Sequence, residues 1–142
     1  MKKMRTPELL ERYHNEDKLF KYEEKYLKKK LMMKADEVFA KWIRDRDKAK
    51  DCVSYWAANC KNIIQNNCHR LWRERFSHRW DEDNCAWGCA SCNGYNKQEH
   101  QQLFTVRQIK MFWEDWVAEQ FRERHKNKPT IEEMEEVINR YK

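Results

Sequence analysis

The sequence predicts an α+β protein that is mainly helical, with a small ββα core flanked by N- and C-terminal helices. Charged residues make up 38% of the 142-residue chain and only two glycines occur, which is typical of long helices with solvated faces. All six cysteines and both glycines lie between residues 52 and 94, so the centre of the chain differs from its flanks. Apolar residues recur at helical spacing on both sides of this centre.

The N-terminal part is predicted to be helical and basic. Thr6-Pro7-Glu8 resembles a helix start, with a hydroxyl at the N-cap, proline at the first helical position and an acid in the first turn. Residues 1–33 are therefore expected to form a basic helical extension. The lysines at 28–30 would either contact phosphates or form the soluble flank of a helix.

A second helix is predicted over residues 34–49. Its apolar stripe has the spacing i, i+3, i+4, i+7 and i+8 and consists of Ala35, Val38, Phe39, Trp42 and Ile43. The opposite, solvent-facing side is expected to carry Lys41, Arg44, Arg46 and Lys48. The cysteine-rich core, residues 52–100, would follow this helix. Its asparagine-rich stretches predict turns and a short hairpin.

Two more helices are expected after the core, which is predicted to turn helical from about residue 90. The helix over residues 105–125 has an apolar face made of Val106, Ile109, Trp113, Trp116, Val117 and Phe121. Pro129 is then expected to interrupt the helical structure. Thr130 and Glu133 have the spacing of a capping box, which predicts a last helix over 130–142.

The length fits one domain, expected over residues 34–142, behind the N-terminal extension. No apolar run is long enough to cross a membrane, and no apolar signal segment follows the basic start of the chain. We therefore expect a cytoplasmic protein without a membrane partner. In that reducing compartment, cysteines are expected to bind metal rather than to form disulfides.

The cysteine spacing predicts one structural zinc ion. Cys89 and Cys92 have the CxxC spacing of a zinc knuckle, in which one tight turn offers two thiolates. The expected ligand set is Cys52, Cys60, Cys89 and Cys92. Because the gap between the first two exceeds the usual gap of about two to four residues, Cys68 or Cys85 could replace one of them. Buried cysteines without a metal are the alternative.

His69, Asn84 and Asn93 form an ordered series around the predicted hairpin. A ββα-metal nuclease needs such a series: a neutral imidazole (His69) that deprotonates water, and an asparagine (Asn84) that braces the hairpin and orients the ring. Asn93, on the following helix, would hold a divalent cation against the scissile phosphate. His78 and His100 have no place in this series and are expected to be solvated surface residues.

Four arginines follow His69 closely: Arg70, Arg73, Arg75 and Arg79. Together with Lys97, they are expected to bind the phosphates of a nucleic acid. Arginine suits this role because its guanidinium binds phosphate through two parallel hydrogen bonds. Ion pairs with Glu74, Asp81 and Glu82 are the alternative interpretation of the arginines.

Three blocks of the chain resemble the phage NinG/Rap recombination nucleases. The first is KADEVFAKWIRDRD at residues 34–47, and the second is RWDEDN at 79–84 followed by Cys89-x2-Cys92-Asn93. The third is the closing stretch 130–142, which ends INRYK. The resemblance covers residues 34–142 and keeps the order of the blocks.

The resemblance implies an HNH-type, treble-clef-like endonuclease that cleaves branched DNA such as D-loops and Holliday junctions. It implies that His69 is the general base, Asn84 the middle asparagine, and Asn93 a ligand of Mg²⁺ or Mn²⁺. It also implies zinc ligation by Cys52, Cys89 and Cys92. A homodimer is a further hypothesis, because symmetric resolution of a junction needs two active sites. If phage-encoded, the protein would act in the bacterial host cytoplasm.

Two departures from the family pattern keep an alternative open. Tyr55 stands where the family has the second cysteine of a close CxxC, and Asn67-Cys68 replaces Ala-Gly before the histidine. The alternative is a catalytically inactive zinc module that binds branched DNA or a recombination partner protein. A third alternative, a purely structural helical adaptor, would not account for the series His69, Asn84 and Asn93.

Overall fold

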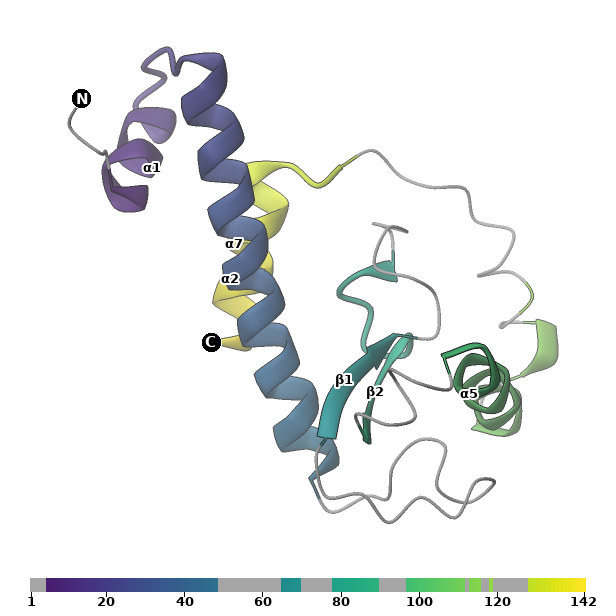
Figure 1. Cartoon of the computed structure of the whole chain (residues 1–142). Helices are drawn as coiled ribbons and strands as arrows, with labels where there is room; N and C mark the ends of the chain where they lie inside the picture. The colour runs from purple at the N-terminus through teal and green to yellow at the C-terminus, as the bar shows by residue number, and fades with distance from the viewer. Residues whose placement is uncertain are drawn as a thin grey trace. The chain divides into compact units, whose positions relative to one another are not determined.

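The computed structural model describes residues 5–48, 65–69, 78–89, 97–111, 113–115, 118 and 128–142. Only the backbone is described at residues 65–69, 87, 89, 97–101, 107 and 111. The described chain is mainly helical, as predicted, with the element order α1 (Thr6–His14), α2 (Lys21–Asp47), β1 (Gln65–His69), β2 (Cys85–Cys89), α5 (Lys97–Met111) and α7 (Ile131–Tyr141) (Figure 1). Within these ranges, no helix combines the length and the apolar character needed to cross a membrane.

The chain forms two compact units. Unit 1 consists of residues 1–38 and 130–142, and unit 2 of residues 39–129. Unit 1 therefore contains α1, the first part of α2 and α7. Unit 2 contains the last part of α2, the two strands and α5.

The predicted helix start at residue 34 is wrong, because α2 begins at Lys21 and runs without interruption to Asp47. The residues from 21 to 34 are lysine, glutamate, leucine, methionine and tyrosine, and they include no glycine or proline that would end a helix. The Glu23 carboxylate caps the new start by accepting a hydrogen bond from the backbone N–H of Phe20 at 2.8 Å. The predicted extension of residues 1–33 thus ends inside a continuous helix.

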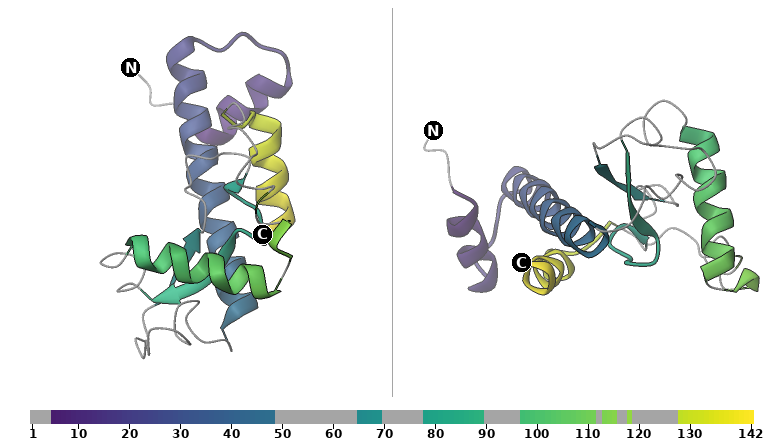
Figure 2. Two further views of the ribbon diagram at one scale, coloured as in Figure 1. Left: turned by 90° about the vertical axis from the view of Figure 1, so that its right-hand side faces the viewer. Right: turned by 90° about the horizontal axis from the view of Figure 1, so that it is seen from below.

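Unit 1 is held by an apolar core and by polar contacts at its edge. The core residues are Leu9, Leu27, Leu31, Ala35, Ile131 and Met134, all buried. The Tyr13 hydroxyl donates to the Glu132 carboxylate at 2.6 Å, and the His14 ring lies 3.0 Å from a Glu135 carboxylate oxygen. These contacts join α1 to α7, and α7 runs alongside α2 in both views of Figure 2.

The predicted capping box at the start of α7 is confirmed. The Thr130 hydroxyl accepts from the backbone N–H of Glu133 at 3.2 Å, and the Glu133 carboxylate accepts from the backbone N–H of Thr130 at 2.8 Å. Both groups satisfy N–H donors that have no partner inside the helix. The helix start at Thr6-Pro7-Glu8 is also confirmed, although Thr6 is the first helical residue rather than the cap.

Unit 2 contains the predicted hairpin. Strands β1 and β2 pair antiparallel, with Gln65 opposite Cys89 and His69 opposite Cys85. Helix α5 follows the hairpin and packs on it through Phe104, which is buried against Ala86. In Figures 1 and 2 the hairpin lies between the C-terminal end of α2 and α5.

The position and the rotation of α5 differ from the prediction. The chain is helical before residue 105, in line with the turn to helix predicted from about residue 90, but one helix runs from Lys97 to Met111 across the predicted start at 105. Of the apolar face predicted for residues 105–125, Val106, Ile109 and Trp113 are exposed, Trp113 to 83%. The buried side is the opposite one, with Phe104 and Gln108 one turn apart. The remaining members of that face, Trp116, Val117 and Phe121, lie outside the described residues.

The capping box predicts a loss of stability when Thr130 is changed. Thr130→Ala should lower the free energy of unfolding by about 1 kcal/mol, because the Glu133 N–H loses its acceptor. Urea unfolding followed by circular dichroism measures the change. Thr130→Ser keeps the hydroxyl and is the matched control; an equal loss in Thr130→Ser would contradict the capping role.

Candidate functional site

The loop of residues 78–84, which leads into β2, is the best described part of the predicted site. It is a series of turns closed by its own backbone: the N–H of Asp81 donates to the His78 carbonyl at 3.4 Å, and the N–H of Asn84 donates to the Asp81 carbonyl at 3.1 Å. The Asp81 carboxylate also accepts from the N–H of Asp83 at 3.0 Å, as an aspartate does in an Asx turn.

Asn84 braces this loop from inside. Its side chain is completely buried, and its amide nitrogen donates to the carbonyl oxygen of His78 at 2.9 Å. A buried amide joined to a buried carbonyl fixes the loop, because neither group has water as a substitute partner. Asn84 is thus a rigid point directly before β2.

The prediction that His78 is a solvated surface residue is wrong. Its ring is buried, and Nδ1 lies 3.3 Å from a carboxylate oxygen of Asp81, three residues along the chain. No apolar periodicity marks this stretch, so the sequence offered no sign that the loop would fold over the ring. The aspartate at i+3 was the only local hint of a partner.

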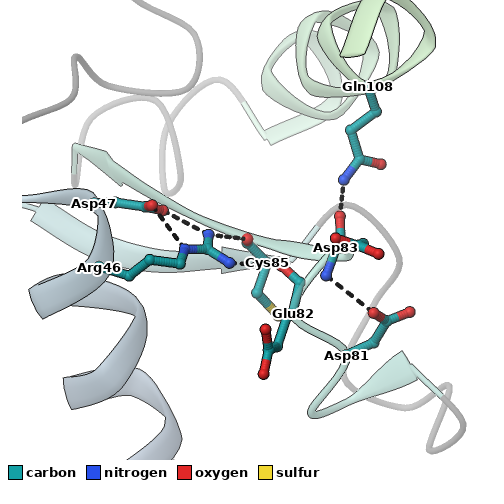
Figure 3. Close-up of polar contacts among 7 residues, drawn as sticks. All are labelled: Arg46, Asp47, Asp81, Glu82, Asp83, Cys85 and Gln108. Carbon is teal, nitrogen blue, oxygen red and sulfur yellow. Dashed lines mark hydrogen bonds and ion pairs between the residues drawn. The ribbon is translucent and has the colours of Figure 1, made fainter. Parts of the chain in front are cut away.

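Arg46 of α2 contacts the same loop, although the sequence predicted it on the solvent-facing side of the helix. Its guanidinium donates to the carbonyl oxygens of Glu82 at 3.0 Å and Cys85 at 2.9 Å (Figure 3). It also pairs with the buried carboxylate of Asp47 at 2.7 Å. The planar guanidinium reaches all three because its five N–H groups point in fixed, divergent directions.

The charge of Arg46 is maintained by Asp47. Burial by itself would lower the pKa of Arg46, but the hydrogen bond and the negative charge of Asp47 outweigh burial and raise this pKa. The guanidinium carbon of Arg46 also lies 5.3 Å from the centroid of the Trp42 ring, within cation–π range. Arg46 is therefore a permanent positive charge beside the start of β2.

Two acids of the loop, Glu82 and Asp83, interact electrostatically with this positive charge, and Asp81 precedes them in the sequence. The pKa of Asp83 is raised, first by partial burial and then by repulsion from Asp81 and Glu82, while Arg46 acts in the opposite direction. From the other side, the buried Gln108 of α5 donates its amide to the carbonyl oxygen of Asp83 (Figure 3). The loop is thus held by α2 and α5 together.

The strand register relates His69 to this loop. His69 is the last residue of β1 and lies opposite Cys85, the residue directly after Asn84. The backbones of His69 and Asn84 therefore meet at one end of the hairpin, although they are far apart in sequence. Only the backbone of His69 is described, so the direction of its ring stays a prediction.

The other predicted site residues are described in part or not at all. Those outside the described residues are Cys52, Cys60, Arg70, Arg73, Arg75, Cys92 and Asn93. Of His100, only the backbone is described. Cys89 ends β2 and Lys97 begins α5. Arg79 lies over the Trp80 ring, with 5.9 Å between its guanidinium carbon and the ring centroid.

Cys85 is buried inside the hairpin end. Its Sγ lies 3.9 Å from the carbonyl oxygen of Arg79, which is the geometry of a weak thiol hydrogen bond. Among the described residues, no three histidine, cysteine, aspartate or glutamate side chains form a group that could hold a metal ion. The side chains of the predicted zinc ligands Cys52, Cys60, Cys89 and Cys92 lie outside the described residues.

Comparison of the chain with models of known protein families, with curated proteins and with solved structures finds no match. The resemblance to the NinG/Rap nucleases therefore stays a prediction from the motifs. The structure does connect two of its blocks, since Arg46 of the first block binds the carbonyl groups of Glu82 and Cys85, at and just after the second.

The burial of Asn84 predicts a large effect of its removal. Asn84→Ala leaves the buried carbonyl of His78 without its donor and should lower the free energy of unfolding by about 2–3 kcal/mol. Chemical unfolding followed by circular dichroism measures this. Asn139→Ala, at an exposed asparagine of α7, should change stability by less than about 0.5 kcal/mol. Similar losses in the two variants would contradict the bracing role.

The raised pKa of Asp83 predicts a pH-dependent effect. A carboxyl whose folded-state pKa is raised contributes stability that is present at low pH and is lost as the pH rises through that pKa. Asp83→Asn should therefore match the wild type at acidic pH and be more stable at neutral pH. Because this carboxyl is largely exposed, the gain should be about 0.5 kcal/mol or less.

Melting temperatures of both proteins from pH 3 to pH 7 test this prediction about the folded-state pKa, since the range spans the usual carboxyl pKa of about 4. Glu11→Gln, which removes an exposed carboxylate of α1 in the other unit, is the control for a change in net charge. An Asp83→Asn variant less stable than the wild type at neutral pH would show that the carboxylate is favourable there.

Proposed function

We propose that the protein is a metal-dependent, HNH-type endonuclease that cleaves branched DNA intermediates of recombination, such as D-loops and Holliday junctions. The observation that carries the proposal is the register of the hairpin, which pairs His69 with Cys85 beside the buried Asn84. Helix α5 follows directly on the hairpin and packs against it. A strand histidine, a bracing asparagine and a following helix are the parts that the proposed chemistry requires.

The roles of the residues follow from this arrangement. His69, as a neutral imidazole, would take a proton from the water that attacks the scissile phosphate. Asn84 would keep the hairpin end rigid so that the imidazole stays in position. When bound near Asn93, a Mg²⁺ or Mn²⁺ ion supplies positive charge to the phosphate. Arg79, with the arginines before it, would contact the phosphates beside the cleavage point.

A structural zinc ion is part of the proposal. Four thiolates, from Cys52, Cys60, Cys89 and Cys92, are a donor set that suits zinc, and Cys89 stands at the end of β2 where a knuckle would begin. The ion would hold the loop-rich centre of the chain in one conformation. Its bond to thiolates contributes directly to folding in small domains of this kind.

A second candidate function is favoured by the residues that depart from the family pattern. Cys68 stands directly before His69 on β1, where it could draw the strand into the zinc site. The protein would then be a zinc module that binds branched DNA or a recombination protein without cutting. If this module binds DNA, it would share the DNA-binding surface of the nuclease and differ from it only in catalysis.

A cleavage assay separates the two functions. Labelled Holliday junction, D-loop and linear duplex DNA are incubated with the protein, with and without added Mg²⁺ or Mn²⁺. We expect metal-dependent cutting of the branched substrates, and we expect His69→Ala to reduce it by about 10²- to 10⁴-fold, the usual contribution of a general base. Added imidazole should restore part of the activity of His69→Ala.

His14→Ala is the matched control, because His14 is a partly exposed histidine of α1 outside the hairpin. Its cutting rate should equal that of the wild type. Tight binding of branched DNA with no cutting under either metal would support the inactive module and overturn the nuclease. Metal analysis of the purified protein should find about one zinc ion per chain for a four-thiolate site.

A further inference from the structure

An exposed aromatic pair stands at the start of α2 in unit 1. The rings of Phe20 and Tyr22 are stacked, with 5.8 Å between their centroids and 6° between their planes. The two residues are 63% and 60% exposed, although large aromatic side chains usually bury most of their surface. A pair of parallel rings open to solvent is the form of a surface on which a flat ligand can stack.

The charge around this pair is positive. Lys21, Lys25 and Lys29 are exposed, and none of them forms an ion pair with another residue in the described part of the chain. Both acids of residues 20–29 form ion pairs with other basic residues: Glu23 with Arg12 at 3.1 Å, and Glu24 with Lys28 at 2.5 Å. Among the residues that the structure describes, these three positive charges near the rings are therefore not paired with an acid.

The aromatic and basic groups share one side of the helix. Tyr22, Lys25 and Lys29 have the spacing i, i+3 and i+7, which places them in a row about 10 Å long. The buried residues Leu27 and Leu31 lie on the opposite side of α2. The core of unit 1 thus orients the row towards solvent.

We infer that this surface of Phe20, Tyr22, Lys25 and Lys29 binds unpaired nucleotides of a DNA strand. The bases would stack on the exposed rings, and Lys25 and Lys29 would contact the phosphates that follow. Stacked aromatic rings beside lysines suit this ligand because each nucleotide offers one flat apolar group and one negative charge. The inference rests on the proposed function only in taking DNA as the ligand.

The aromatic and basic surface of α2 is expected to bind a different part of a DNA substrate from the part that the hairpin binds. Fully paired DNA hides its bases in the stack, so the rings would read only nucleotides that are unpaired, as at a branch point or a flap. A preference for branched DNA would then arise in unit 1, while cleavage would belong to His69 in unit 2.

Fluorescence anisotropy with a labelled oligo(dT) strand and a duplex of equal length tests the inference. The measurements use the full chain carrying His69→Ala, so that no cleavage interferes. The double variant Phe20→Ala/Tyr22→Ala should weaken oligo(dT) binding by about tenfold or more and change duplex binding by less than about twofold. Phe20→Trp/Tyr22→Phe, which keeps both rings, should bind oligo(dT) like the parent protein.

Two further variants complete the test. Met33→Ala removes a side chain that is 56% exposed on the same side of the helix and should leave both affinities unchanged. Lys25→Gln/Lys29→Gln should lower the slope of log affinity against log salt for oligo(dT) by about 1.4, or about 0.7 for each lost phosphate contact.

Each result supports or overturns the inference independently of the nuclease. Selective loss of oligo(dT) binding in Phe20→Ala/Tyr22→Ala supports it even if the wild type never cuts DNA. Unchanged oligo(dT) binding in that variant, an equal loss for duplex, or no binding of oligo(dT) by the parent would overturn it. In the last case the aromatic pair would be a surface for a protein partner.

Discussion

The guanidinium of Arg46 joins helix α2 to the start of strand β2, and the geometry of the hairpin end depends on this connection. One side chain donates to two backbone carbonyls, of Glu82 and Cys85, while Asp47 balances its charge. Asp47 is buried and Arg46 is partly buried, and charges removed from water are tolerated only when they are paired and hydrogen-bonded. Lysine could not replace Arg46, because an ammonium group lacks the planar array of donors.

Around this connection the protein uses polar contacts where a larger domain would use apolar packing. Asn84 holds the His78 carbonyl, Asp81 approaches the His78 ring, and Gln108 holds the Asp83 carbonyl. Each contact is short in range and specific in direction, so together they restrain the conformation of the loop. A strand end that is fixed in this way can position a catalytic side chain within the small tolerance that catalysis requires.

The two proposed activities belong to different units of the chain. The hairpin end of unit 2 offers a rigid frame for His69, and the start of α2 in unit 1 offers stacked rings and free positive charge. Recognition of unpaired nucleotides and hydrolysis of a phosphodiester would therefore be separable by mutation. Such a division explains how a small protein could select a branched structure without reading base sequence.

Much of the fold could be predicted from local patterns. The capping box of Thr130 and Glu133 and the apolar stripe of Ala35, Val38, Phe39 and Ile43 were sufficient to predict two helical segments. The asparagine-rich stretch before His69 predicted the hairpin correctly. These features depend on interactions between residues a few positions apart, which the sequence displays directly.

The sequence by itself determined the mainly helical class, the hairpin, the helix that ends the chain and the cysteine-rich centre. Only the tertiary structure decided that α5 buries Phe104 and Gln108 rather than the side that carries Val106 and Ile109, that His78 is buried, and that Arg46 turns inward. The physical reason is that these outcomes depend on partners distant in sequence. Arg46 turns inward because it donates to a backbone carbonyl of β2. The pattern of residues within α2 does not indicate where that carbonyl lies.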